Sequence, residues 1–318
     1  MKMNPLGSTG LTVTEVGFGV LTIGGTQLNL PLAEGASLIR YALERGINFL
    51  DTAQYYRTYP YIRRALKGTS FTPVIVSKCL YGSYGQMQEA IEEARKELDR
   101  DIIDIFLLHE VRSDMDMEQR AGAFSCLQDY KSKGIIKAAG ISTHHVDVAC
   151  IAAKNPYIDV LFPLINYKGL GIRNGKDPGT RESMALAIKA AADSGKGVFA
   201  MKVLGGGILS ADYRTAIEYV RDLPGISSIM MGFGYKHEID RIIEMMEGTL
   251  PLDYKPDLSS KRIFIDQGDC EGCEACLHRC PNKAIYMNEK GQANIRYDIC
   301  LTCGYCAPVC PVRAIIML

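Results

Sequence analysis

The chain has 318 residues, of which 47% are hydrophobic and 23% are charged. Lys and Arg together number 36, as do Asp and Glu, so the formal net charge is zero. This balance argues against a global field for nucleic acid or for a membrane surface. The longest apolar runs are too short to cross a bilayer, and the first residues lack the apolar core of a secretory signal. We therefore expect a cytoplasmic globular protein, with neither nucleic acid nor membrane as a partner, built from one large and one small domain.

Short apolar strands alternate with amphipathic helices through most of the chain. Strands are predicted over 13–20, 48–52, 74–79, 103–109, 137–143, 159–167, 197–204 and 226–233. Helix-length patterns lie between them, and the pattern over 84–100 repeats apolar residues at helical spacing: Met87, Ile91, Ala94 and Leu98. Eight βα units predict an α/β fold, a (β/α)8 TIM barrel over residues 1–250. A doubly wound sheet is the alternative, but no G-x-G-x-x-G follows the first strand.

The two ends of this predicted barrel have their own signals. Residues 1–12, with Gly-Ser-Thr-Gly at 7–10, predict a hairpin that plugs the bottom of the barrel. Residues 248–262 are rich in Pro, Gly and Ser without periodicity, and we predict a linker over 251–262. A second, small α+β domain then occupies 263–318.

The 11 cysteines are unevenly distributed along the chain. Cys79, Cys126 and Cys150 lie apart from the others and are interpreted as small core residues, whereas the remaining eight fall within 270–310. Both cysteine runs follow C-x2-C-x2-C-x3-C-P. In a cytoplasmic chain such clustering favours metal ligation over disulfides.

The spacing predicts two 4Fe-4S clusters, each with three thiolates from one run and a fourth from the other. We assign Cys270, Cys273, Cys276 and Cys310 to cluster I. We assign Cys300, Cys303, Cys306 and Cys280 to cluster II. A pair of structural zinc sites is the alternative, but zinc requires neither the three-residue step nor the following Pro. The segment resembles the bacterial two-cluster ferredoxins over its whole length.

Four ionisable residues fall at the carboxyl ends of the early strands, where the chemistry of such barrels takes place. Asp51 ends the second strand, Lys78 lies in the third, His109 follows the fourth, and Tyr56 comes five residues after Asp51. An ordinary tyrosine has a pKa near about 10 and is a poor acid. A lysine beside the phenol stabilises the phenolate, and a carboxylate keeps that lysine charged and oriented. A histidine can orient a carbonyl oxygen or share the proton load. Such a set can protonate a carbonyl.

These residues carry a family resemblance. DTA-x2-Y at 51–56, SK at 77–78 and LLH at 107–109 resemble the tetrad of the aldo-keto reductases, in the same order, and the likeness includes LGSTGLTV at 6–13. The resemblance implies NADPH-dependent carbonyl reduction with Tyr56 as general acid, tuned by Asp51 and Lys78, and with His109 orienting the substrate. A barrel followed by a ferredoxin-like tail resembles the iron-sulfur branch of this family.

The predicted nicotinamide pocket is less similar to the family pattern. Cofactor-binding candidates after the later strands are Ser142, Thr143, Asn166, Lys202, Gly232 and Gly234. The Lys-Ser and Arg residues that grip a 2′-phosphate in the family are not visible after the last strand. Gly232–Gly234 before a helix could offer N–H groups to a phosphate, with Lys236 adding charge. Gly205–Gly207 fits either a phosphate cradle or a tight turn.

The leading hypothesis is an oxidoreductase of aldo-keto reductase type, acting on a small molecule, whose clusters exchange electrons with the barrel site or with a redox protein partner. A cluster-driven reductase without nicotinamide, which could hold a flavin, is the second hypothesis. A non-catalytic electron-transfer subunit is the third. A hydride carries two electrons whereas a cluster carries one, so coupling them needs a converter such as a flavin or chemistry that accepts single electrons.

Overall fold

The computed structural model of the chain describes residues 1–25, 27–258, 262–280, 282–300 and 304–317. Within them, eight parallel strands close into a barrel, and the last strand pairs with the first. The strands are β3 (Val16–Gly19), β4 (Phe49–Asp51), β5 (Val74–Cys79), β6 (Ile103–Leu108), β7 (Ile136–Thr143), β8 (Val160–Pro163), β11 (Gly197–Ala200) and β12 (Ser228–Met231). Each lies inside or overlaps one of the predicted strands, so the predicted TIM barrel is confirmed.

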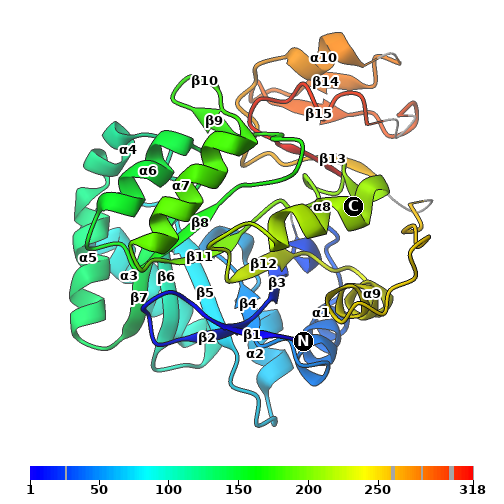
Figure 1. Cartoon of the computed structure of the whole chain (residues 1–318). Coiled ribbons are helices and arrows are strands. Elements are labelled where there is room, and N and C mark those ends of the chain that lie inside the picture. The colour runs from blue at the N-terminus through cyan, green and yellow to red at the C-terminus, as the bar shows by residue number, and fades with distance from the viewer. Residues whose placement is uncertain (26, 259–261, 281, 301–303, 318) are drawn as a thin grey trace.

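Helices surround the barrel (Figure 1). They are α1 (Leu32–Glu44), α2 (Tyr59–Leu66), α3 (Tyr84–Leu98), α4 (Asp114–Gln119), α5 (Ala121–Ser132), α6 (Val146–Lys154), α7 (Arg181–Asp193), α8 (Tyr213–Arg221) and α9 (Lys236–Met246). Short 3-10 turns η1 (Val20–Ile23), η2 (Gln54–Tyr56) and η3 (Ser210–Asp212) and a small hairpin of β9 (Arg173–Asn174) and β10 (Asp177–Pro178) lie in the loops. The apolar stripe predicted on α3 is buried against the barrel, as expected for a helix with one apolar face.

The barrel interior is a packed core. Every residue of β5 and β6 is buried, which is typical of parallel strands covered on both faces. Inside the barrel Phe162 stacks on Phe199 with ring centroids 4.1 Å apart, and Phe49 meets Phe199 edge-on. The hairpin of β1 (Met3–Pro5) and β2 (Thr12–Thr14) adds Leu6 and Val13 to this core. The predicted hairpin therefore closes the barrel at the amino-terminal ends of its strands, opposite the end where the tetrad is expected.

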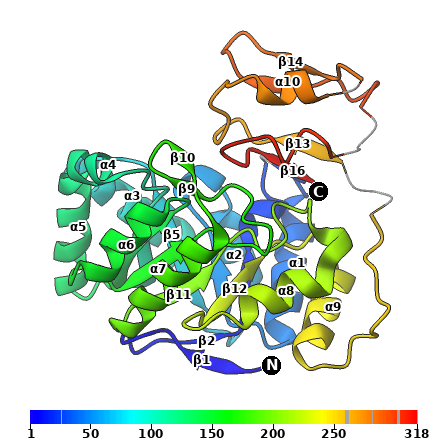
Figure 2. The same ribbon diagram turned by 45° about the horizontal axis from the view of Figure 1, so that its top comes forward.

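A small domain follows the barrel and lies over its other end (Figures 1 and 2). Its strands β13 (Ile263–Ile265) and β16 (Ile315–Met317) pair antiparallel, as do β14 (Ile285–Met287) and β15 (Ala293–Ile295), and α10 spans Ala275–Arg279. The β13–β16 pair lies next to the barrel, whereas α10, β14 and β15 lie farther out (Figure 2).

The second domain packs against the glycine-rich turn after β11, Gly205–Gly207. The buried Arg313 donates hydrogen bonds to the carbonyl oxygens of Ala307 and Gly205, and the Met317 N–H donates to Gly206 O at 2.7 Å. Gly207 has a φ of +85°, and a Cβ there would lie 2.0 Å from Met317 O. Glycine is needed in this turn because the backbone of the second domain approaches it closely. Of the two interpretations left open by the sequence, this contact favours a tight turn over a phosphate cradle.

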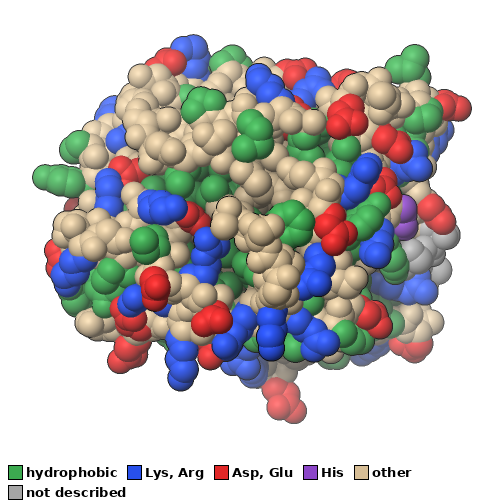
Figure 3. All heavy atoms as spheres, turned by 90° about the horizontal axis from the view of Figure 1, so that it is seen from below, with side chains coloured by type: hydrophobic (Ala, Val, Ile, Leu, Met, Phe, Trp, Pro, Cys, Tyr) green, Lys and Arg blue, Asp and Glu red, His purple; other side chains and the backbone are tan. Residues whose placement is uncertain are grey.

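The surface agrees with the balanced composition. Seen from below, acidic and basic side chains are intermixed, without a field of one sign (Figure 3). Among the residues that the structure describes, no helix combines the length and apolarity that a bilayer crossing requires. Cys79 and Cys126 are buried as predicted, but Cys150 is exposed on the outer face of α6, so its assignment to the core was wrong.

Candidate active site

The structure brings the four predicted tetrad residues together at the carboxyl ends of β4, β5 and β6. Lys78 and Asp51 form a buried ion pair with Nζ 2.5 Å from Oδ1, and Lys78 also donates to Thr52 O at 2.7 Å. The Tyr56 hydroxyl lies 3.3 Å from His109 Nε2. Lys78 Nζ is 4.9 Å from the centroid of the Tyr56 ring. Tyr56 belongs to the short 3-10 turn η2, which follows β4 and packs against β5.

Burial is the main influence on the protonation states of Tyr56 and His109. Burial raises the pKa of Tyr56 well above its usual value, and the carboxylates of Asp51 and Asp269 raise it further. Burial and the charge of Lys78 hold the pKa of His109 well below its usual value. At neutral pH the phenol therefore keeps its proton and the imidazole is neutral. The Tyr56 hydroxyl is therefore a protonated phenol that lies close to a neutral histidine.

The Lys78–Asp51 ion pair lies next to the Tyr56 ring. Burial lowers the pKa of Lys78, and the adjacent Asp51 carboxylate opposes that effect. Burial likewise raises the pKa of Asp51, and Lys78 opposes it. Each partner thus opposes the effect of burial on the other, and removing one of them would leave an uncompensated charge in a buried site.

The second domain contributes residues to the same site. Asp269, which directly precedes Cys270, places Oδ2 3.1 Å from the Nζ of Lys202. Lys202 follows β11 in a left-handed conformation with a φ of +57°, which is uncommon for a residue other than glycine. Burial by itself would raise the pKa of Asp269, but the charges of Lys202 and His144 outweigh it and hold that pKa below its usual value. A carboxylate of the iron-sulfur domain is therefore part of the barrel's mouth.

Glu110 of the barrel is a second carboxylate close to Asp269. Glu110 follows His109, and its carboxylate accepts a hydrogen bond from Arg112 at 2.9 Å. Arg112 also reaches Glu271 of the second domain at 3.0 Å. Burial and the nearby Asp269 charge raise the pKa of Glu110 to about 7, although Arg112 opposes the rise. The sequence reasoning missed Glu110 and Asp269. The only signal for Asp269 was its position directly before the first cysteine, and nothing local shows that it faces the barrel.

Glu110 gives the site a titration near neutral pH. Its folded pKa is raised above its ordinary value, so its contribution to stability is complete at acid pH and is lost as the pH rises through about 7. We expect Glu110→Gln to raise the melting temperature relative to the wild type at pH 8 but not at pH 5. The exposed Glu89→Gln on α3 is the matched control. Equal Glu110→Gln and wild-type profiles across this range would contradict the prediction.

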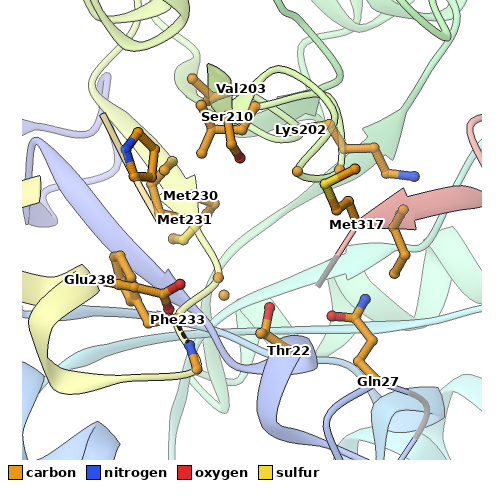
Figure 4. Close-up of a pocket in the computed structure, with 18 of the residues that line it drawn as sticks. Thr22, Gln27, Lys202, Val203, Ser210, Met230, Met231, Phe233, Glu238 and Met317 are labelled. Carbon is orange, nitrogen blue, oxygen red and sulfur yellow. Dashed lines mark hydrogen bonds between the residues drawn. The ribbon is translucent and has the colours of Figure 1, made fainter. Parts of the chain in front are cut away.

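A cavity of about 570 Å³ opens between the barrel mouth, the loop after β12 and the second domain. Tyr56 and Asp51 line one part of it, and Lys202, Gly232 and Gly234 line others. Figure 4 shows Thr22 and Gln27, from the loop after β3, together with Met317 of the second domain around the same space. The volume is in the range of small-molecule and cofactor sites.

Three of the predicted cofactor residues are not part of this lining. Ser142 Oγ accepts the N–H of Glu110, and Thr143 Oγ1 donates to Val111 O. The Asn166 side chain makes two hydrogen bonds, both with the backbone of Leu170. Their polar atoms thus hold loops in place. Ser142, Thr143 and Asn166 are therefore not placed to bind a nicotinamide carboxamide in the way that the family resemblance implies. Lys202, Gly232 and Gly234 do line the cavity.

Four cysteines of the second domain, those assigned to cluster I, lie near one another. Burial raises the pKa of the Cys276 thiol to about 11, with further contributions from Cys310, Cys273 and Cys270, so these four lie close together. Cys280 Sγ accepts the N–H of Ala284 at 3.2 Å, a contact of the kind that tunes cluster potentials. Cys303 lies outside the described residues.

The described cysteines are compatible with iron-sulfur cubanes. Within the described part of the chain, no three Cys, His, Asp or Glu side chains converge as ligands of one ion. In a cubane each thiolate binds a different iron, so the four sulfurs surround the cluster without meeting at a point. Cys276 and Cys306 are buried in the small apolar core of the domain, whereas Cys273 is exposed.

A (β/α)8 barrel with this tetrad at its mouth, capped by a domain built to hold iron-sulfur clusters, defines an oxidoreductase. Residues 15–250 match the model of the aldo/keto reductase family, and residues 263–318 match that of the 4Fe-4S dicluster domain. The chain belongs to the aldo/keto reductase family and carries a C-terminal 4Fe-4S dicluster domain.

Individual relatives agree with both parts. The chain is 28% identical to the uncharacterized oxidoreductase YqkF of Bacillus subtilis over 158 residues, 45% of this chain and 49% of that protein. It thus spans about half the length of this relative. The tail is 43% identical to pyruvate synthase subunit PorD of Methanocaldococcus jannaschii over 54 residues, 17% of this chain and 63% of the relative. A solved structure from Pseudomonas aeruginosa, assigned to the aldo-keto reductases, is 26% identical with a TM-score of 0.67 and covers 78% of this chain and 96% of its own.

Proposed function

We propose that this protein reduces a carbonyl group of a small molecule at the barrel mouth, with Tyr56 as the proton donor and with its iron-sulfur domain passing electrons to or from that site. The observation that carries the proposal is the Tyr56 hydroxyl, which faces His109 Nε2 at 3.3 Å and borders the cavity under the second domain. Reduction of a carbonyl to an alcohol takes up two electrons and two protons.

The chain's own residues account for the proton side of this reaction. The substrate oxygen binds between the Tyr56 hydroxyl and His109, both of which can donate a hydrogen bond to it. As electrons reach the carbonyl carbon, the developing charge on oxygen draws the proton from Tyr56. The Lys78 ammonium, 4.9 Å from the tyrosine ring centroid, stabilises the phenolate that remains. A bound nicotinamide dinucleotide would supply the electron pair and the second proton as a hydride.

The position of the second domain supports an electron route to the same site. Asp269 bonds to Lys202 in the barrel mouth, and the next residue, Cys270, is a predicted ligand of cluster I. Cys270 thus lies next to a residue of the barrel mouth, whereas α10, which carries Cys276, and the β14–β15 hairpin lie farther out (Figures 1 and 2). An external redox protein would reach the domain from that outer side.

A specific observation also favours the cluster-driven alternative, in which no nicotinamide takes part. The polar atoms of Ser142, Thr143 and Asn166 serve the protein's own loops, so the expected grip on the nicotinamide carboxamide is missing. Single electrons would then arrive from the clusters, directly or through a flavin in the cavity.

Anaerobically purified protein, supplied separately with NADH, NADPH and dithionite, tests these routes on a panel of aldehydes and ketones. Turnover with a dinucleotide supports the leading proposal. Turnover with dithionite but with neither dinucleotide supports the cluster-driven route, and bound flavin, read from the extracted chromophore, would identify the converter. The absence of turnover with all three donors would contradict both and favour an electron-transfer subunit.

A further inference from the structure

Arg313 is a buried arginine at the junction of the two domains. It follows Cys310, the last cysteine of the second run, by three residues, and only 1% of its surface is exposed. Arginine is rarely buried to this extent, because taking its charge out of water is costly unless hydrogen bonds and opposite charge compensate for it. The position of Arg313 therefore calls for partners of both kinds.

The hydrogen bonds of Arg313 join the second cysteine run to the barrel. Its Nη1 donates to Ala307 O at 2.7 Å, within that run, and its Nη2 donates to Gly205 O in the turn after β11. Its aliphatic stem packs on Gly171 of the loop after β8, where a Cβ would lie 1.8 Å from Arg313 Cγ. The guanidinium is thus fixed between the cluster-binding loop and the barrel.

Two cluster-binding cysteines lie near this guanidinium. Burial lowers the pKa of Arg313, and Cys310 and Cys306 oppose that fall, because a nearby thiolate favours the charged arginine. By the cysteine spacing, Cys310 is a predicted ligand of cluster I and Cys306 of cluster II. The thiolates and the clusters that they bind therefore bring opposite charge to Arg313.

The first cysteine run contains the same turn without this burial. Lys283 follows Cys280 by three residues, as Arg313 follows Cys310, and both have a left-handed φ, of +53° and +58°. In each turn the N–H of the basic residue donates to the carbonyl oxygen of the last cysteine, at 3.2 Å and 3.4 Å. Lys283, however, is exposed. The repeat places a basic side chain at this position twice, and docking on the barrel buries one of the two.

Reduction of the clusters adds negative charge near this buried cation. Dithionite reduces a 4Fe-4S cluster by one electron, and the added charge is attracted more strongly by a fixed cation in a buried, low-dielectric setting than in water. We propose that Arg313 is the countercharge of the clusters: held on the barrel turn at Gly205, it stabilises their reduced state and raises their reduction potential. By reciprocity, reduction of the clusters strengthens the docking of the second domain on the barrel.

A redox titration of the anaerobic full-length holoprotein, followed by EPR, measures the potentials. At the potential where the wild-type clusters are half reduced, we expect Arg313→Gln to lower the ratio of reduced to oxidised cluster at least about tenfold, which is about 59 mV toward more negative potential for a one-electron couple. Arg313→Lys keeps the positive charge, although it loses the fork of donors, and should change the ratio less than about threefold.

Lys283→Gln is the matched control, because it removes a positive charge from the equivalent turn of the first run. The Lys283 charge is exposed and screened by water and salt, so we expect the ratio to change less than about threefold. Iron analysis verifies that each variant keeps about eight iron atoms per chain.

Hydrogen exchange measures the docking without any substitution. The Met317 N–H donates to Gly206 O across the domain junction, so its exchange with solvent follows the opening of that junction. In the wild-type holoprotein, mass spectrometry of C-terminal peptides should show that exchange at Met317 slows at least about threefold on reduction with dithionite. Peptides from α3, on the outside of the barrel, are the internal control and should exchange equally in both states.

Two results would overturn the proposal: a potential in Arg313→Gln that is unchanged or more positive, or exchange at Met317 that is equal or faster in the reduced wild type. A more positive potential would mean that the substitution acts by admitting water to the clusters, which favours the added charge. If Arg313→Gln does not retain its clusters, the exchange experiment decides alone. Neither measurement requires turnover, so both stand apart from the proposed carbonyl reduction.

Discussion

Replacing Tyr56 with Phe is expected to lower kcat for carbonyl reduction by about 10²–10⁴-fold, whichever electron donor is used. The substitution removes a hydroxyl that lies beside His109 at the edge of the cavity, and leaves the ring in place near Lys78. Because burial keeps the Tyr56 phenol protonated, the loss is of proton donation rather than of a charged group. The effect should appear in kcat more than in KM, since the hydroxyl is needed most in the transition state.

The adjacent Tyr55 is the matched control for this variant. It is half-exposed, and its hydroxyl lies against Gly268 of the second domain, away from His109. Tyr55→Phe should change kcat by less than about threefold, a small change on the scale of a lost general acid. Full activity in Tyr56→Phe, under conditions where the wild type turns over, would contradict the proposed mechanism in both its nicotinamide and its cluster-driven form.

Replacing Cys276 with Ala is expected to remove cluster I and with it about half of the iron, from about eight to about four atoms per chain. Cys276 is the buried member of the predicted cluster I set and lies near Cys270, Cys273 and Cys310. Dithionite-supported turnover should then fall to background if electrons enter the site through cluster I, whose predicted ligand Cys270 follows Asp269 at the barrel mouth.

The exposed thiol of Cys150 on α6 provides the control, since Cys150→Ser should keep the full iron content. Iron and acid-labile sulfide analysis, with EPR of the reduced protein, reads the outcome. Retention of about eight iron atoms in Cys276→Ala would contradict the ligand assignment. Dinucleotide-supported turnover in the same variant tells whether hydride transfer needs the clusters at all.

The fold was predictable because its signals are local. Each strand of the barrel is a short apolar run, and the helices between them carry apolar stripes that need a sheet to cover. The tetrad was equally accessible, because Asp51, Lys78 and His109 end or closely follow strands that a parallel barrel must place side by side. The domain limits and the functional roles of these residues stay predictions.

The composition of the cavity was not predictable, because it depends on which loops meet. Ser142, Thr143 and Asn166 occur in the expected order along the chain, yet their polar atoms serve neighbouring backbone groups. Gly205–Gly207 could have cradled a phosphate, but the turn holds the second domain through bonds to Arg313 and Met317. Neither outcome is encoded in residues adjacent in sequence.

The sequence by itself determined the barrel, the tetrad and the cysteine spacing, because each follows from a repeat of a few residues and from strand ends that must converge. The tertiary structure decided how the two domains share one site. Asp269 reaches Lys202 across 67 positions of sequence, and Glu238 turns back to the N–H of Gly234 instead of leaving it for a ligand. Such contacts depend on how the loops are placed in space, and a linear pattern does not specify that placement.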